Sequence, residues 1–245
     1  DKMYSVIAHD LRGPIGTVKM MLEMMISMFD PAVVGEPNME LIHQTYQQTD
    51  EAVSLLDNLL KWTKSQTGRM NVVPQKFRAE DILPSLVEIY KPTAKMKGLA
   101  LSCMSSDTST QNMFADIEMA KTIVRNFITN ALKFTPSGGQ VTVFTSEAKE
   151  PGYIVVNVKD TGCGISDEDQ QKLFNTKTHF TKFGTNSEEG SGLGLLLCMD
   201  FAQKNGGELL FESKLDQGST FSFTVPVWRQ ELENKSREMI DDSEK

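Results

Sequence analysis

The chain has 245 residues, enough for two modest domains that each bury a core of their own. A formal net charge of -8, from 25 basic and 33 acidic residues, argues against nucleic acid as the main binding partner. Three widely spaced cysteines without a CxxC pair argue against a zinc or disulfide framework and predict reduced thiols in a cytosolic compartment.

The sequence shows no signal-peptide pattern and no apolar run of roughly 18 residues. Contact with a membrane is therefore expected only through segments absent from this chain. The chain begins with Asp1-Lys2 and lacks an initiator Met, so we expect it to be part of a longer protein.

Two amphipathic helices are predicted at the start. Apolar residues recur three and four positions apart from Met3 to Phe29, and a second stripe runs from Ile42 to Leu60. The turn residues Asp30-Pro31 and Gly35-Glu-Pro37 separate them. An antiparallel hairpin of this kind leaves one apolar face uncovered, and pairing two copies into a four-helix bundle would bury it. We therefore expect a homodimer through the hairpin.

His9 is the candidate phosphate acceptor on the first helix. It lies two residues from Ile7 and from Leu11, so it points about 160° away from both members of the apolar stripe, toward solvent. Asp10 could accept a proton from one ring nitrogen while the other attacks phosphorus, and Arg12 places a positive charge one turn away. A lone histidine on a helix is more often a solvated surface residue. The motifs further along the chain favour the catalytic interpretation.

Beyond a hinge predicted from Gly68 to Phe77, the pattern changes to an α+β two-layer sandwich with one mixed sheet under a few helices. Asp116 is the expected N-cap of the central helix. The charged tail, Arg229 to Lys245, is expected to be a frayed helix or disordered. The other expected elements are helices at about 81–97 and 191–205, strands at 99–104, 113–115, 139–146 and 153–159, and two final strands that end at Val227.

The central helix carries polar side chains on one face. Asn126, Asn130 and Lys133 stand at i, i+4 and i+7, while Phe134 belongs to the opposing buried face. An amide oxygen is a suitable hard ligand for Mg²⁺, and a lysine adds charge toward phosphates. An isolated pair of asparagines would more often be a polar helix face. Here three glycine-rich segments follow in order, which favours a nucleotide site.

These segments predict close backbone approach to a ligand. Asp160 ends a strand and could accept a hydrogen bond from an exocyclic amine, and Gly162 and Gly164 follow it in a turn. The second segment opens a helix whose free N–H groups form an anion site, and it contains Gly190, Gly192, Leu193 and Gly194. In the third segment, after Gly218, Thr220 is expected to close the pocket.

The motifs resemble a known family in two parts. Residues 1–68, with the segment from His9 to Pro14, are similar to the HisKA dimerisation and phosphotransfer domain. About Gln75 to Trp228 resembles the HATPase_c or GHKL (Bergerat) ATP-binding fold. Together they resemble the catalytic core of a sensor histidine kinase of two-component systems.

The resemblance implies a set of roles. Asp10 would be the general base, Asn130 the Mg²⁺ ligand and Asp160 the adenine-recognition residue, while residues of about 165 to 189 would form an ATP lid. Cofactor-binding roles would fall on Asn126, Asn130, Lys133, Phe134, Asp160, Gly162, Gly164, Gly190, Gly192, Leu193, Gly194 and Thr220. Gly13 stands where the family usually has the Thr or Asn that positions water for dephosphorylation, which puts phosphatase activity in doubt.

The function expected from this resemblance is Mg²⁺-ATP-dependent autophosphorylation of His9 and transfer to an aspartate of a response-regulator receiver. The expected domains are phosphotransfer (1–68), hinge (69–77), ATP-binding (78–228) and tail (229–245), in the cytoplasmic part of a membrane-anchored sensor. Two alternatives fit the residues less well. Hsp90-like, gyrase-like and MutL-like ATPases have a water-activating Glu at the position of Asn126, and anti-sigma-type serine kinases lack the helical hairpin. A catalytically silent ATP-binding scaffold is the second candidate.

Overall fold

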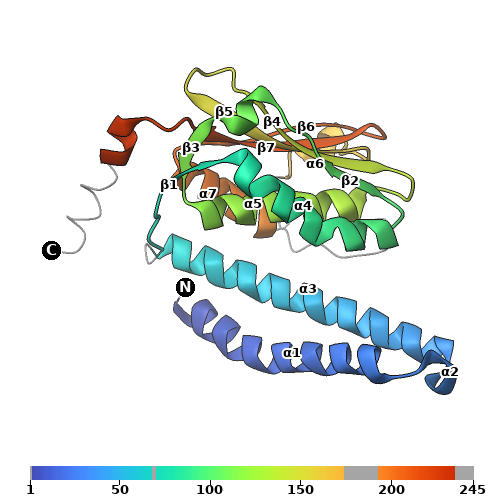
Figure 1. Ribbon diagram of the computed structural model, residues 1–245. Helices are drawn as coiled ribbons and strands as arrows, with labels where there is room; N and C mark the ends of the chain where they lie inside the picture. Colours follow the sequence, from blue (N-terminus) through green and yellow to red (C-terminus); the bar gives the residue numbers. More distant parts are fainter. Residues whose placement is uncertain (1, 68–69, 174–192, 235–245) are drawn as a thin grey trace. The chain divides into compact units, whose positions relative to one another are not determined.

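The computed structural model describes residues 2–67, 70–173 and 193–234, without the side chains of residues 2–10 and of a few other positions. The chain divides into two compact units, Asp1–Asn71 and Val72–Lys245 (Figure 1). Among the described residues, no helix combines the length and the apolar character that a membrane span requires.

The first unit is a helical hairpin. Its long helices α1 (Lys2–Met28) and α3 (Glu36–Gln66) pack against each other, and the short helix α2 (Pro31–Val34) lies in the turn. Asp30 caps α2 by accepting the N–H of Ala32 at 2.9 Å, and Gly35 adopts a positive φ of 85° that favours glycine. Helix α1 continues through Pro14 without a break.

Ion pairs between α1 and α3 set the register of the hairpin. Arg12 contacts Asp57, and Lys19, seven residues further along α1, contacts Asp50, seven residues earlier in α3. The equal and opposite steps are those of two antiparallel helices with a heptad-like spacing. Apolar side chains nevertheless remain exposed on this unit, namely Leu11, Val18, Met20, Met21, Met24, Met28, Leu41 and Leu55.

The second unit contains a five-stranded mixed sheet. Its strand order is β2-β4-β5-β7-β6, with β2 parallel to β4 and every other neighbouring pair antiparallel. A separate two-stranded antiparallel sheet is formed by β1 (Gln75–Arg78) and β3 (Asn112–Ala115). The bounds of the main strands are β2 Ala100–Cys103, β4 Gln140–Glu147, β5 Tyr153–Asp160, β6 Leu209–Lys214 and β7 Gly218–Pro226.

Helices cover one face of this sheet, so the predicted two-layer sandwich is confirmed (Figure 1). They are α4 (Ala79–Met96), α5 (Ile117–Phe134) and α7 (Leu193–Lys204), with a short 3-10 turn at Asp107–Thr110 and the short helix α6 (Asp167–Gln170) in the connections. The buried ring of Phe127 from α5 lies 5.7 Å from that of Phe221 and 6.2 Å from that of Phe223 in β7, between centroids. The core therefore sits between α5 and the middle of the sheet.

The connection between the units differs from the sequence prediction. Gln75 to Phe77, expected in the hinge, belong to β1, which pairs with β3, and Phe77 is buried. Within the described residues, the part of the connection without regular structure is therefore 70–74. At the other end of the chain, 230–234 are helical in the tail that begins at Arg229.

Candidate nucleotide site

Helix α5 is the element on which the site is built. Its N-terminus is capped by Asp116, whose Oδ1 accepts the N–H groups of Glu118 and Met119, both at 3.0 Å. The residues that it buries against the sheet include Ile123 and Phe127. A capped helix with one apolar face holds its opposite face in a fixed position.

Asn126 lies where α5 meets the beginning of α7. Its Nδ2 donates to the carbonyl oxygen of Thr122 at 3.0 Å. A methyl group placed on Gly194 would lie 2.9 Å from Oδ1 of Asn126, closer than real side chains approach. The glycine at this point of the second motif thus allows α7 to start directly against Asn126. The structure brings together the first and second motifs that the sequence pattern singled out.

Asn130 and Lys133 continue the same face toward the C-terminal end of α5. Asn130 is half-buried, and its amide has no hydrogen-bond partner among the described residues. Lys133 is also half-buried, with its Nζ 5.8 Å from the ring centre of Phe134. A half-buried amide without a protein partner is available to a ligand, whereas Phe134 helps to position the lysine.

Asp160 ends β5 and is 5% exposed. Its Oδ1 accepts two backbone hydrogen bonds, from the N–H of Gly162 at 2.8 Å and from the N–H of Ser219 at 3.1 Å. Burial raises the pKa of the carboxyl group, and the two hydrogen bonds oppose this shift because they favour the ionised form. Oδ2 has no hydrogen-bond partner among the described residues, so it can accept one from a ligand.

Three glycines allow the chain to close tightly around Asp160. A methyl group on Gly162 would lie 2.4 Å from the carbonyl oxygen of Phe134, and one on Gly218 would lie 2.1 Å from that of Asp160. Gly164 and Gly218 also adopt positive φ angles of 62° and 89°. The end of α5, the loop after β5 and the start of β7 therefore meet with no room for side chains at these positions.

Ser219 lies beside Asp160. In this segment the sequence pattern had singled out Thr220 and not Ser219. Side chains alternate along a strand, so Ser219 shares the face of Phe221, which packs on α5. Thr220 lies on the opposite face, paired with Lys159 in β5 and with Glu212 in β6. The expectation that Thr220 closes the pocket therefore stays a prediction, with Ser219 as a second candidate from the same segment. The buried phenylalanine two positions after Ser219 was the signal that could have identified it.

Several predicted residues lie outside what the structure describes. The backbone of His9 and Asp10 belongs to α1, but their side chains are not described. Gly190 and Gly192 are outside the described residues, as is most of the predicted lid. The described beginning of that lid, 165–173, contains α6, and Leu193 and Gly194 open α7.

Residues 115–229 match the family model described as histidine kinase-, DNA gyrase B- and HSP90-like ATPase. These residues form an ATPase domain of that family. Its predicted resemblance to sensor histidine kinases is also confirmed by curated relatives. The adaptive-response sensory kinase SasA of Rippkaea orientalis is 31% identical over 229 residues, which cover 92% of this chain and 57% of that protein. The sensor protein EvgS of Escherichia coli strain K12 is 27% identical over 91% of this chain and 18% of its own length.

Solved structures show the same fold. Full-length ShkA in complex with AMPPNP has a TM-score of 0.68 and 22% identity, covering 92% of this chain and 46% of that chain. The histidine kinase AdeS of Acinetobacter baumannii has a TM-score of 0.59 and 16% identity, covering 90% of this chain and 98% of that chain. The second unit thus has the GHKL ATPase fold. The chain spans less than two thirds of the length of the SasA and EvgS sequences.

Proposed function

We propose that the chain is the catalytic core of a sensor histidine kinase, which phosphorylates itself on His9 with Mg²⁺-ATP and passes the phosphoryl group to an aspartate of a response-regulator receiver. The observation that carries this proposal is the extent of the similarity to SasA. The similarity to SasA covers 92% of the chain, whereas the match to the ATPase model begins only at residue 115. The similarity must therefore extend over most of the helical hairpin, on which His9 is the proposed acceptor.

The ATPase family also contains gyrase and HSP90 types, so the ATP-binding fold alone does not select a kinase. Asn126 favours the kinase, because an amide cannot act as the general base that activates water for hydrolysis. Its Nδ2 is also engaged with the carbonyl oxygen of Thr122. A site that excludes a hydrolytic base is suited to passing a phosphoryl group to another acceptor.

The described residues fit a Mg²⁺-nucleotide. Oδ2 of Asp160 would accept the exocyclic amine of adenine, in the orientation imposed by the N–H groups of Gly162 and Ser219. Asn126 and Asn130 would face the phosphates, with Asn130 holding the metal and Lys133 adding positive charge. When bound, Mg²⁺ neutralises charge on the phosphates. On the acceptor side, one ring nitrogen of His9 would attack the γ-phosphorus as the bond to the leaving ADP breaks. Asp10 would accept the proton from the other ring nitrogen.

The hairpin supports dimerisation. Its exposed apolar side chains, including Met20, Met24 and Leu41, would be buried if two copies formed a four-helix bundle. We place the chain in the cytoplasm, as the catalytic part of a sensor kinase that segments outside this sequence would anchor to a membrane. Its receiver partner would dock on the hairpin near the phosphorylated His9.

The test is incubation of the chain with Mg²⁺ and γ-labelled ATP, followed by acid and alkali treatment and mapping of the label by mass spectrometry. Acid-labile, alkali-stable label on His9, lost in His9→Gln while nucleotide affinity is unchanged, is the expected result. Label retained in full by His9→Gln would contradict the assigned acceptor. Nucleotide binding with no label in either protein would instead favour the silent scaffold.

A further inference from the structure

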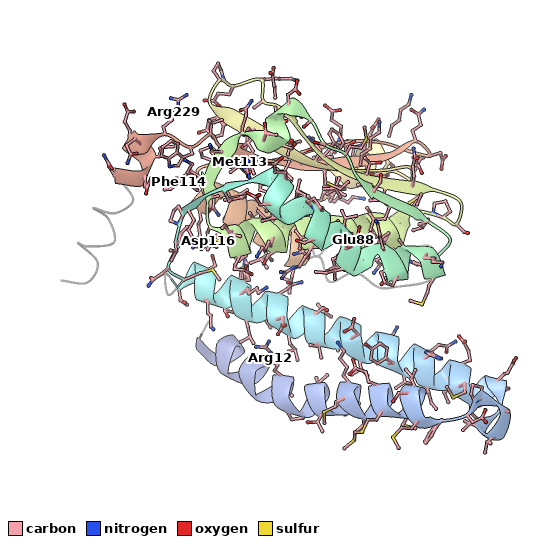
Figure 2. The ribbon with its side chains drawn as sticks, in the orientation of Figure 1. Arg12, Glu88, Met113, Phe114, Asp116 and Arg229 are labelled. Carbon is pink, nitrogen blue, oxygen red and sulfur yellow. The ribbon has the colours of Figure 1, made fainter. Side chains whose placement is uncertain are left out.

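Asp116, labelled in Figure 2, is hydrogen-bonded to three segments of the second unit. Its Oδ1 caps α5 through Glu118 and Met119, and its Oδ2 accepts the backbone N–H of Val73 at 3.0 Å. Its own N–H donates to Oδ1 of Asn205, just after α7, at 2.6 Å. One aspartate therefore contacts the connection from the hairpin, the helix with the nucleotide residues, and the end of the helix that follows the lid.

The hydrogen bond from Val73 lies where the connection from the hairpin enters the second unit. The second unit begins at Val72, and residues 70–74 have no regular structure. Pro74 restricts Val73 to extended conformations, and the hydrogen bond from the exposed Val73 limits the path of this segment further. Because the acceptor is a carboxylate, this bond is stronger than one between neutral groups. The connection is thereby tied to the N-terminus of α5.

Helix α5 links Asp116 to the nucleotide site. Asn126 and Asn130 lie on the same uninterrupted helix that Asp116 caps. The other anchor, Asn205, is itself held because its Nδ2 donates to the carbonyl oxygen of Phe201 in α7 at 2.7 Å. The two helices of the site and the incoming connection therefore share one fixed point.

We propose that Asp116 is a positioning residue. It fixes the direction in which the connection leaves the ATP-binding unit relative to α5, and so limits the orientations in which the hairpin-borne His9 can meet the bound nucleotide. The proposal rests on the proposed kinase function, but its structural part is independent of catalysis. Asp116 touches neither ATP nor histidine in this scheme, so it should affect the rate of transfer more than nucleotide binding.

Two variants break the bond from opposite sides. Val73→Pro removes the N–H donor and leaves Asp116 intact. Asp116→Asn keeps an oxygen acceptor for the cap of α5, where Asn and Asp serve about equally well, but replaces the acceptor facing Val73 with an amide donor. Val72→Pro is the matched control, since it introduces a proline next door without removing a hydrogen bond that the described structure contains. Val73→Ala is the second control, because it keeps the donor.

The experiment measures nucleotide affinity and the autophosphorylation rate of the whole chain. We expect affinity within about twofold of the parent and a rate about tenfold lower in both variants, as loss of a hydrogen bond to a charged group implies. The double variant Val73→Pro with Asp116→Asn should be no slower than either single one. Rates equal to those of Val72→Pro, or additive losses in the double variant, would overturn the proposal.

A second readout separates this proposal from the proposed function. Distances between encoded spin labels at residue 54 in α3 and residue 89 in α4 should spread over a wider range in Val73→Pro and Asp116→Asn, but not in the two controls. If the parent takes no phosphate on His9 yet these distances broaden as expected, the kinase proposal fails and Asp116 still positions the connection. Unchanged distances would overturn the role of Asp116 whatever the activity.

Discussion

The backbone N–H of Ser219 donates to Oδ1 of Asp160 at 3.1 Å, which joins the start of β7 to the end of β5. The N–H of Gly162 donates to the same oxygen at 2.8 Å. Two donors on one oxygen fix the plane of the carboxylate, while the described residues leave Oδ2 without a hydrogen bond. A buried carboxylate in a fixed orientation can select a ligand with a donor at one point.

Asp160→Asn should weaken adenine-nucleotide binding by about tenfold or more. Its amide oxygen can still accept from Gly162 and Ser219, but the group facing the ligand becomes a donor and opposes the adenine amine. Titration calorimetry with a non-hydrolysable ATP analogue measures the loss. An affinity equal to that of the parent would show that Asp160 does not contact the base.

The same substitution should stabilise the protein without ligand at neutral pH. Burial raises the folded-state pKa of Asp160 above its ordinary value of 3.8, so the ionised carboxylate disfavours folding above that raised pKa. Asp160→Asn should therefore increase the free energy of unfolding. The increase should reach its maximum above the raised pKa and should disappear as the pH falls to 3.8. Urea unfolding across this range tests the sign. A gain independent of pH would exclude desolvation of the carboxylate as its cause.

Ser219→Ala should weaken nucleotide binding more than Thr220→Ala does. The Oγ of Ser219 lies on the Asp160 side of β7, 2.9 Å from Oγ of Ser213, whereas Thr220 pairs with Lys159 on the opposite face. Loss of one hydrogen bond corresponds to about a fivefold change in affinity. Calorimetry on the two variants decides between them, and a larger loss in Thr220→Ala would restore the original expectation from sequence.

Gly218→Ala should lower the free energy of unfolding by more than about 2 kcal/mol, because it combines backbone strain with a steric clash. Gly218 has a φ of 89°, and its added methyl group would lie 2.1 Å from the carbonyl oxygen of Asp160. Gly138→Ala is the matched control, since Gly138 has a φ of 86° but nothing within 4 Å of the added methyl. Denaturant unfolding should show a loss of about 1 kcal/mol in this control. Equal losses would mean that close approach to β5 contributes nothing.

Removing the ion pair between Arg12 and Asp57 should change hairpin stability little. Nε of Arg12 lies 3.1 Å from Oδ1 of Asp57, with side chains 58% and 32% exposed, and solvent weakens such pairs. A double-mutant cycle with Arg12→Ala and Asp57→Ala should give a coupling below about 1 kcal/mol. If Arg12 serves incoming phosphates, as its place one turn after His9 suggests, Arg12→Ala alone should slow autophosphorylation. An equal slowing in Asp57→Ala would point to a purely structural role.

Local patterns in the sequence were sufficient for the two long helices, the sandwich and the motifs around Asn126, Asp160 and Gly194. Helical periodicity, strand alternation and glycine chemistry act over a few residues, so they can be read without the fold. The ATPase family assignment rests on the same motifs and is confirmed by the match over residues 115–229.

Only the tertiary structure decided which distant groups meet. Strand β1 escaped prediction because four residues carry too little pattern, so its pairing with β3 and the burial of Phe77 appear only in the structure. The face of β7 that packs against α5 places Ser219, and not Thr220, on the same side of the sheet as Asp160. The bond from Val73 to Asp116 spans 43 positions of the chain and leaves no periodic trace in the sequence. Such contacts depend on how the completed sheet and helices bring chain segments together, which local preferences do not specify.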